Sequence, residues 1–324
     1  MAGLPDGRSA FLAPKFAPAT ALAAGGDPSA MLRLVYGRGT VAAARALVAA
    51  RDADLVVVDC LLLAPLAGAL ASGVPTAVLF HTFGGWWVRD FVRGPIGRIG
   101  GMRGLAPARL WDAAAARLVL TDRELDPGRD DPRLAGATWT GTTELGAEPG
   151  PRGPRPRVLV ALSSTTWPGM LPVYRRIVAA LAALDIDAVV TTGGVDLGGE
   201  LAGAPNVEVR GWTPHAELLT GVDLVIGHGG HSTTLKALAH GVPLLILPIN
   251  PTADQRWIGG LLERAGLGRR LPKSASAATI RRAVLALLAD PVTADRTAAT
   301  GRRLRAQRSG AEVAADALLG FLGV

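Results

Sequence analysis

Short apolar, β-branched runs alternate with helical segments along most of this chain, and this alternation limits the possible folds more than any other feature of the sequence. Turn residues bound the runs, as they bound β-strands, and the runs are Leu55–Asp59, Thr76–Thr82, Arg117–Thr121, Val158–Ser163, Ala188–Thr192, Val207–Gly211, Leu224–Gly227 and Leu244–Leu247. Between most of them lie segments rich in Ala, Leu and Arg with helical spacing, such as Val41–Ala50, Leu171–Leu184 and Thr233–His240. Strands that alternate with helices form parallel βαβ units, so we expect an α/β fold with buried parallel sheets.

A stretch rich in proline and glycine, residues 146–157, divides the chain. Such a composition holds neither a helix nor a central strand, so we interpret it as a linker. We expect a first domain over residues 1–145 and a second over 158–305. A C-terminal helical segment, 306–324, follows.

The first half lacks the opening strand that is expected of a nucleotide-binding fold. A nucleotide-binding half opens with a buried strand, a glycine turn and a helix, but no convincing strand precedes Leu55. Residues 1–26 have the composition of a loop. Asp27-Pro28 is typical of a helix start, and we expect that helix to be interrupted near Gly37 and Gly39.

The composition excludes several classes of protein. Hydrophobic residues make up 49% and charged residues 19% of the chain, which is too apolar for an intrinsically disordered protein. The single cysteine, Cys60, excludes an intramolecular disulfide framework and a cysteine-rich zinc site. The formal net charge is +7, but aromatic residues make up only 5% and no basic stripe interleaves with them, so we expect no nucleic-acid partner.

Two segments bear on targeting. The N-terminal residues lack the charged and then apolar order of a secretory signal, so we expect a cytoplasmic protein. Residues 61–80 carry no charge over a length that could span a bilayer. The turn Gly73-Val74-Pro75 splits this run, and we expect a short helix and a buried strand instead of a transmembrane segment.

Residues 211–255 contain the pattern that is most suggestive of chemistry. Leu224–Gly227 predicts a buried strand, the His-Gly-Gly-His sequence at 228–231 a tight turn, and Ser232-Thr233 a helix start. A helix N-terminus behind a glycine turn offers backbone N–H groups and positive potential to an anion, so we predict a diphosphate site here. His228, at the strand end, can donate to a phosphate oxygen; a purely structural histidine is the alternative.

Two further loops lie at the same predicted sheet edge, where α/β proteins bind ligands. Trp212 follows the strand Val207–Gly211 and could stack on a base, with a buried core tryptophan as the alternative. Asp254 and Gln255 begin the helix after Leu244–Leu247. Such a pair alone is more often an N-cap than a sugar ligand, but here it shares the edge with the other loops.

These pieces together resemble the donor-binding signature of family 1 glycosyltransferases of the GT-B fold. The matching residues are Trp212-x-Pro214, His228-Gly229-Gly230-x-Ser232-Thr233-Thr234-Leu235, Ala239-x-Gly241-Val242-Pro243, and Pro248 with Asp254-Gln255. The resemblance implies two Rossmann-like domains that face a cleft, the first of them incomplete here, with the last helix crossing back onto the first domain. It also implies inverting, metal-independent sugar transfer from a nucleoside diphosphate, with electrostatic stabilisation of the departing diphosphate.

By matching position, the resemblance also implies roles for individual residues. Trp212 would stack on the base, and Asp254 and Gln255 would contact sugar hydroxyls. The donor nucleotide site as a whole would comprise Trp212, Pro214, His215, His228, Gly229, Gly230, Ser232, Thr233 and Lys236. Lys236 replaces a glutamate that many members use for the ribose, so it is either a phosphate contact or a solvated charge, and the choice between uracil and thymine stays open. His215 stands where plant members have glutamine.

The general base of the family is a histidine after the first strand, and no histidine precedes His81 in this sequence. Asp59 matches the aspartate that orients this base, and Thr82 matches a position near the sugar. Three explanations are open: the sequence starts late, His81 serves as the base, or the protein binds nucleotide sugar or a partner transferase without turnover. Asp59 and His81 are therefore the candidate catalytic residues, with a structural role as the alternative for His81. Trp86 and Trp87 are a candidate aromatic wall on the acceptor side, with packing inside their own loop as the alternative.

The sequence thus predicts the transfer of a hexose or deoxyhexose from a UDP- or dTDP-sugar to a small apolar acceptor, without a cofactor or metal. A catalytically silent nucleotide-sugar-binding protein is one alternative. A nucleotide-sugar epimerase or hydrolase on the same fold is the other, because a fold does not determine a function. A homodimer is compatible with the sequence, which does not determine the oligomeric state.

Overall fold

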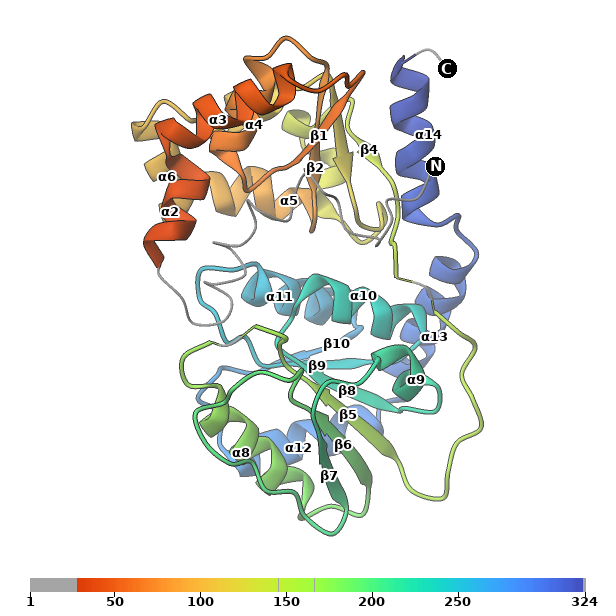
Figure 1. Ribbon diagram of the computed structural model, residues 1–324. Helices are drawn as coiled ribbons and strands as arrows, with labels where there is room; N and C mark the ends of the chain where they lie inside the picture. The colour runs from red at the N-terminus through yellow and green to blue at the C-terminus, as the bar shows by residue number, and fades with distance from the viewer. Residues whose placement is uncertain (1–27, 145, 166, 323–324) are drawn as a thin grey trace. The chain divides into compact units, whose positions relative to one another are not determined.

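The computed structural model describes residues 28–144, 146–165 and 167–322, which form two compact α/β units (Figure 1). The first unit runs to Thr140 and includes the segment that starts at Gly310, and the second unit is Gly141–Ser309. Each unit has one sheet whose neighbouring strands pair in parallel. The predicted α/β class is therefore confirmed. The predicted loop over residues 1–26 and the helix start at Asp27 lie outside the described residues.

The sheet of the first unit has the strand order β1-β2-β3-β4. Its strands are β1 (Val56–Asp59), β2 (Thr76–Phe80), β3 (Ala116–Val119) and β4 (Thr138–Trp139). The first three were predicted within two residues at each end, because their β-branched runs are bounded by turn residues. The two-residue strand β4 was missed. In the β1–β2 register Asp59 lies opposite Leu79, so both strands end at the same edge of the sheet.

Short helices surround this sheet. They are α2 (Pro28–Tyr36), α3 (Arg38–Ala49), α4 (Leu63–Leu70), α5 (Gly84–Trp86), the π-helix η1 (Trp87–Phe91), α6 (Pro95–Met102), α7 (Pro107–Asp112), the 3₁₀ helices η2 (Pro127–Asp130) and η3 (Pro132–Leu134), and α14 (Gly310–Leu322). The predicted interruption occurs at Gly37, where a Cβ atom would lie 2.4 Å from the carbonyl oxygen of Arg33. The expected interruption at Gly39 is wrong, because Gly39 lies inside α3. The uncharged run 61–80 forms α4 and β2, joined through Gly73 with a φ of +84°, as predicted.

The sheet of the second unit is doubly wound, with the strand order β10-β9-β8-β5-β6-β7. Its strands are β5 (Arg157–Ala161), β6 (Asp187–Thr191), β7 (Val207–Arg210), β8 (Leu224–Gly227), β9 (Leu244–Ile246) and β10 (Gly268–Arg270). The chain builds outward from β5 through β6 to β7, returns to the other side of β5 as β8, and continues to β9 and β10. The order therefore reverses between β5 and β8, and doubly wound sheets bind ligands beyond the strand ends at such a switch point.

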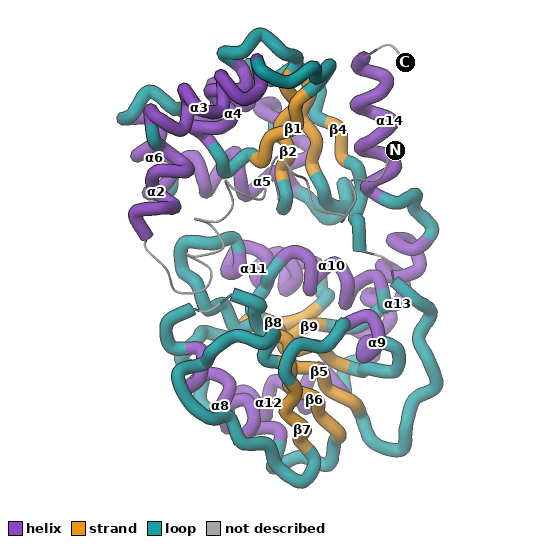
Figure 2. The backbone as a smooth tube through the Cα atoms, in the orientation of Figure 1, coloured by secondary structure: helices purple, strands orange, loops and turns teal. Residues whose placement is uncertain are grey.

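Helices cover both faces of this second sheet (Figure 2). They are α8 (Met170–Leu181), α9 (His215–Leu219), α10 (His231–Ala239), α11 (Gln255–Ala265), α12 (Ala277–Leu288) and α13 (Pro291–Arg305). One core forms where α8 and α12 pack on the sheet, with Tyr174, Ile177, Ile280 and Val284 buried against strand residues. The described part of the predicted linker, 146–156, contains neither helix nor strand, and β5 starts directly after it.

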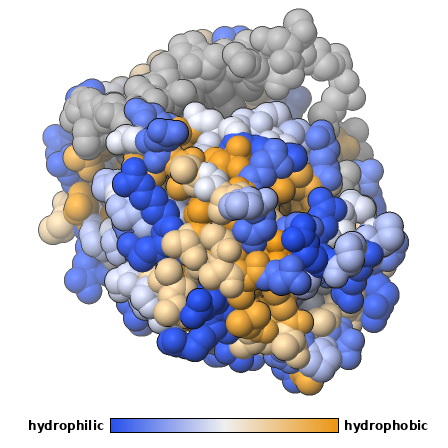
Figure 3. Space-filling model, turned by 90° about the horizontal axis from the view of Figure 1, so that it is seen from below, coloured by the Kyte–Doolittle hydropathy of each residue, from blue (hydrophilic) through white to orange (hydrophobic). Residues whose placement is uncertain are grey.

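Among the residues that the structure describes, few large apolar side chains are exposed. The face drawn in Figure 3 has a band of apolar residues bordered by hydrophilic ones. The exposed large hydrophobic residues are Leu32, Val57, Met102, Trp212, Leu285, Val292, Leu319 and Phe321. Among the described helices, none has both the length and the apolar character that crossing a bilayer requires. Trp212, with 71% of its surface exposed, borders a pocket at the end of the second sheet.

Candidate functional site

A pocket of about 630 Å³ lies at the switch point of the second unit, beyond the ends of β5 and β8. Eight of the nine residues of the predicted donor nucleotide site line it, together with Gln255 from the predicted sugar contacts: Trp212, Pro214, His215, His228, Gly230, Ser232, Thr233 and Lys236. The predicted residues Gly229 and Asp254 are not among the lining residues. The hydroxyl residues Ser163, Ser164 and Thr165, which lie just beyond β5, also line the pocket and were missed. The sequence did carry a signal for them, because they lie at the end of the predicted strand Val158–Ser163, at the edge where ligands bind.

The turn between β8 and α10 has a backbone that only glycine can form. Gly229 has a φ of +89°, and a Cβ atom there would lie 2.7 Å from the carbonyl oxygen of Gln255. At Gly230 a Cβ atom would lie 2.5 Å from Cε1 of His228. The backbone thus passes directly beside the histidine ring before α10 begins at His231. These contacts explain the two adjacent glycines that marked the turn in the sequence.

His228 is the polar side chain at the base of this turn. Burial lowers its pKa to about 4, so the ring is neutral near pH 7 and carries one N–H donor. Its Nδ1 atom is shut off from solvent and has no hydrogen-bond partner among the residues that the structure describes. A buried polar atom without a partner is costly, so the ring is not a fully satisfied structural histidine.

The pocket is also lined by the exposed Trp212 and the partly buried His215. The exposure of Trp212 shows that the alternative of a buried core tryptophan is wrong. Pro214 is the N-cap residue of α9, and Nε2 of His215 lies 3.1 Å from Oγ1 of Thr191. Burial, and then the nearby Lys236 ammonium, lowers the pKa of His215. A neutral imidazole and an exposed indole face suit a neutral aromatic ring.

Glu144 reaches the first turns of α10 from a segment 88 residues away in sequence. Its carboxylate accepts a hydrogen bond from the Ser232 hydroxyl and lies 3.1 Å from the Lys236 ammonium. Lys236 is therefore paired in this structure and is not a freely solvated charge. Sequence patterns gave no indication of Glu144, because it lies beside the proline- and glycine-rich stretch outside every predicted element.

The Asp254–Gln255 pair begins α11 next to the pocket. Gln255 is buried, and its Oε1 accepts hydrogen bonds from the backbone N–H groups of Ile249 (2.7 Å) and Asn250 (2.8 Å). Gln255 thereby holds the loop after β9 in place. Asp254 occupies the N-cap position without a side-chain capping bond. Their predicted contacts with sugar hydroxyls stay predictions.

The first unit carries a second polar pair at its own sheet edge. Asp59 ends β1, His81 directly follows β2, and the His81 Nδ1 atom lies 2.6 Å from Oδ2 of Asp59. The other carboxylate oxygen accepts the backbone N–H of Leu61 at 2.9 Å. The side chain of His81 is 46% exposed, so it is accessible to a ligand. An imidazole that donates from Nδ1 to a carboxylate has its lone pair on Nε2, the arrangement of an oriented general base.

The loop after His81 differs in part from the prediction. Trp87 is buried and contacts Phe91, Trp111 and the His81 ring, with a centroid distance of 5.0 Å to the latter. It belongs to the core, so the expectation that it lines an acceptor wall is wrong and the packing alternative holds. Trp86 is partly buried and stays a candidate. Thr82 is buried, with 1% of its surface exposed.

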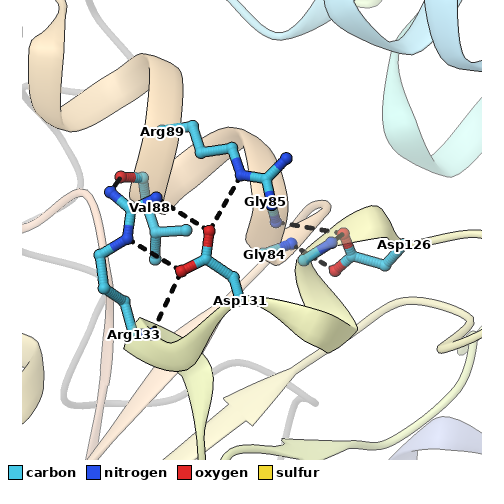
Figure 4. A network of polar contacts seen from close by, with 8 residues as sticks. Gly84, Gly85, Val88, Arg89, Asp126, Asp131 and Arg133 are labelled. Atoms are coloured by element: carbon cyan, nitrogen blue, oxygen red, sulfur yellow. Dashed lines mark hydrogen bonds and ion pairs between the residues drawn. The ribbon is translucent and has the colours of Figure 1, made fainter.

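Two aspartates bind residues of this loop (Figure 4). The fully buried carboxylate of Asp126 accepts hydrogen bonds from the backbone N–H groups of Gly84 (2.7 Å), Gly85 (3.1 Å) and Gly128 (2.8 Å), and from Nε1 of Trp139 (3.0 Å). Asp131 binds Arg133 and Arg89, and the hydrogen bond from Arg133 is the main cause that lowers its pKa. The loop that carries His81 is therefore anchored by charged groups that no local pattern indicated.

Comparisons with known proteins find glycosyltransferases among the similar sequences and structures. A family model described as the C-terminal domain of erythromycin biosynthesis protein CIII-like proteins matches residues 175–318. The chain is 36% identical over 174 residues to the elloramycin glycosyltransferase ElmGT of Streptomyces olivaceus, covering 52% of this chain and 43% of that protein. It is 36% identical over 151 residues to 4'-demethylrebeccamycin synthase of Lentzea aerocolonigenes, covering 46% and 33%. The chain thus spans less than half the length of these curated relatives.

Solved structures extend the likeness to both units. The kitacinnamycin glycotransferase matches with a TM-score of 0.71 and 25% identity, over 90% of this chain and 82% of that one. The calicheamicin glycosyltransferase CalG4 matches with a TM-score of 0.66 and 25% identity, over 90% and 80%. The glycosyltransferase VinC, solved in complex with dTDP, shares the fold with a TM-score of 0.61 and 21% identity, over 89% and 75%.

Proposed function

Because the chain belongs to the bacterial natural-product branch of the family 1 glycosyltransferases with the GT-B fold, we propose that it transfers a sugar from a UDP- or dTDP-sugar to a small apolar acceptor. The observation that carries this proposal is the pocket at the switch point of the second unit, with its glycine turn and the unpartnered Nδ1 of His228. The relatives act on natural products by their names, and VinC was solved with dTDP. We expect no metal or other cofactor.

In the proposed donor complex, the diphosphate lies against the backbone N–H groups at the start of α10. A helix N-terminus of this kind stabilises negative charge through its dipole and its free N–H groups. The base would stack on Trp212, and the sugar would face Gln255 and Asp254. The neutral ring of His228 would donate one hydrogen bond to a phosphate oxygen. This arrangement favours the negative charge that develops on the leaving group as the glycosidic bond breaks.

In the proposed reaction, His81 is the general base and Asp59 orients it. The acceptor hydroxyl gives its proton to Nε2 of His81, and its oxygen forms a bond to the anomeric carbon. The bond from that carbon to the diphosphate oxygen breaks, and the electron pair leaves with the diphosphate. Attack opposite the leaving group inverts the anomeric configuration. The short Asp59–His81 contact would also stabilise the imidazolium that forms.

The test of this function is a transfer assay with purified protein. The protein is incubated with UDP-glucose or dTDP-sugars, with and without a panel of phenolic and polyketide acceptors, and products are identified by mass spectrometry. Glycosylated product that forms only with acceptor supports the proposal. Release of the nucleoside diphosphate without acceptor would indicate a hydrolase or epimerase. Nucleotide-sugar binding without any product would indicate a silent binding protein.

Replacing His228 by alanine should weaken the binding of UDP or dTDP by about 1–3 kcal/mol, the range for a hydrogen bond to a charged group. The imidazole N–H supplies that bond in the proposed complex. Titration calorimetry measures the change, with uridine or thymidine as the control ligand, because neither has a phosphate for His228 to contact. Unchanged diphosphate affinity in the variant would remove His228 from the donor site.

A further inference from the structure

The start of α10 already binds an anion, which belongs to the protein itself. Glu144 accepts from the Ser232 hydroxyl and pairs with Lys236 at 3.1 Å, and both of these partners line the donor pocket. The side chains of Lys236 and Glu144 are only 24% and 20% exposed, so solvent screens this pair less than a surface pair. Ser232 and Lys236, which lie one turn apart on α10, are thus both paired with a carboxylate before any ligand arrives.

The backbone of the segment that carries Glu144 packs against α10. At Gly146 a Cβ atom would lie 2.3 Å from the carbonyl oxygen of Ala239, so the segment passes directly against the end of α10. Glu148 then lies 2.7 Å from the Arg305 guanidinium of α13, but its side chain is 79% exposed, so this ion pair contributes little to the position of the segment. The close backbone approach at Gly146 keeps Glu144 beside α10. Its presence there is a feature of the fold.

We propose that Glu144 competes with the donor diphosphate for Ser232 and Lys236, and that it thereby speeds release of the nucleoside diphosphate product. The proposal rests on the function proposed above. Sugar transfer converts a diphosphate diester into a nucleoside diphosphate that has one more ionisable oxygen, so the product binds a cationic site more tightly than the substrate. If the Glu144 carboxylate binds Ser232 and Lys236 again after transfer, it opposes this tighter binding of the product. Phosphate contacts to the backbone N–H groups and to His228 are not affected by Glu144.

The test compares Glu144→Gln with the matched control Glu148→Gln, which lies on the same segment but pairs with Arg305. Calorimetry measures the affinity for inorganic pyrophosphate, for UDP and dTDP, and for uridine and thymidine. Glu144→Gln should bind pyrophosphate and the nucleoside diphosphates about three- to tenfold more tightly, with a smaller gain at high salt. Glu148→Gln should match the wild type, and nucleoside affinity should be the same in all three proteins. Glu144→Ala should reproduce the gain, and unchanged urea midpoints would show that the fold is intact.

Three results would overturn the proposal. Pyrophosphate affinity that is unchanged or lower in Glu144→Gln would mean that the carboxylate does not compete with phosphate. Absence of pyrophosphate binding in every variant would remove the anion site itself. Weaker nucleoside binding in Glu144→Gln would make Glu144 a ligand of the pentose. If the nucleotides fail to bind but the variant still gains affinity for pyrophosphate, the glycosyltransferase function is wrong while the competition by Glu144 stands.

Discussion

Replacing His81 by glutamine is expected to lower the rate of sugar transfer by about 10²- to 10⁴-fold, the usual contribution of a general base. Glutamine can still hydrogen-bond Asp59, but it cannot accept the proton of the acceptor hydroxyl. The Asp59–His81 contact of 2.6 Å at the ends of β1 and β2 is the observation behind this expectation. The measurement is kcat and kcat/KM for the best donor and acceptor found in the transfer assay.

Two controls separate catalysis from structure in this experiment. UDP and dTDP should bind the His81→Gln variant as they bind the wild type, because the donor pocket belongs to the second unit. Asp59→Asn should lose activity as well, whereas Asp112→Asn, which removes an exposed partner of Arg117, should not. A His81→Gln enzyme within twofold of the wild type would show that another group is the base.

Replacing Asp126 by alanine is expected to destabilise the first unit by about 3–5 kcal/mol. The substitution leaves three backbone N–H groups and the indole N–H of Trp139 without their acceptor in a buried site. Each unsatisfied buried donor costs about 1–3 kcal/mol, although water entering the space left by the carboxylate offsets part of this. Urea unfolding followed by tryptophan fluorescence measures the loss.

The matched control for this prediction is Asp130→Ala, at the last position of the 3₁₀ helix η2 that Asp126 caps. Asp130 is an exposed residue that pairs with Arg129 at 3.3 Å, so its removal should change the free energy of unfolding by less than about 0.5 kcal/mol. A loss of similar size in both variants would mean that the helix, and not the buried carboxylate, determines stability here. Faster amide exchange at Gly84 and Gly85 in Asp126→Ala would localise the effect to the loop that follows His81.

The sequence predicted the elements whose determinants are local. The strand Leu224–Gly227 was found with the same bounds, because a buried β-branched run followed by two glycines leaves few alternatives. The turn at Gly73 was predicted because Gly73 and Pro75 interrupt the uncharged run 61–80. By contrast, β4 and β10 were missed. Gly268–Arg270 is short and polar, and it is extended because it pairs with β9 and not because its residues favour a strand.

In the candidate site, too, only the residues that follow predicted strands could be predicted from the sequence. The donor-side residues come from three consecutive strand ends, so parallel topology alone brings them to one edge. The contacts of Glu144 and Asp126 could not be predicted, because they join residues 88 and 42 positions apart without any local pattern. For Trp87 the predicted loop position was correct, but its burial was not predicted, because it depends on packing with Phe91 at the other end of η1 and with Trp111 of α7.

The account depends most on where the nucleotide phosphates bind, and a crystal structure of the complete chain grown with UDP or dTDP measures this directly. We expect both phosphates within hydrogen-bond distance of backbone N–H groups in residues 229–233, with the base on the Trp212 indole. Phosphates bound at any other place on the protein, or a base that leaves Trp212 uncovered, would contradict the proposed donor site and the function built on it.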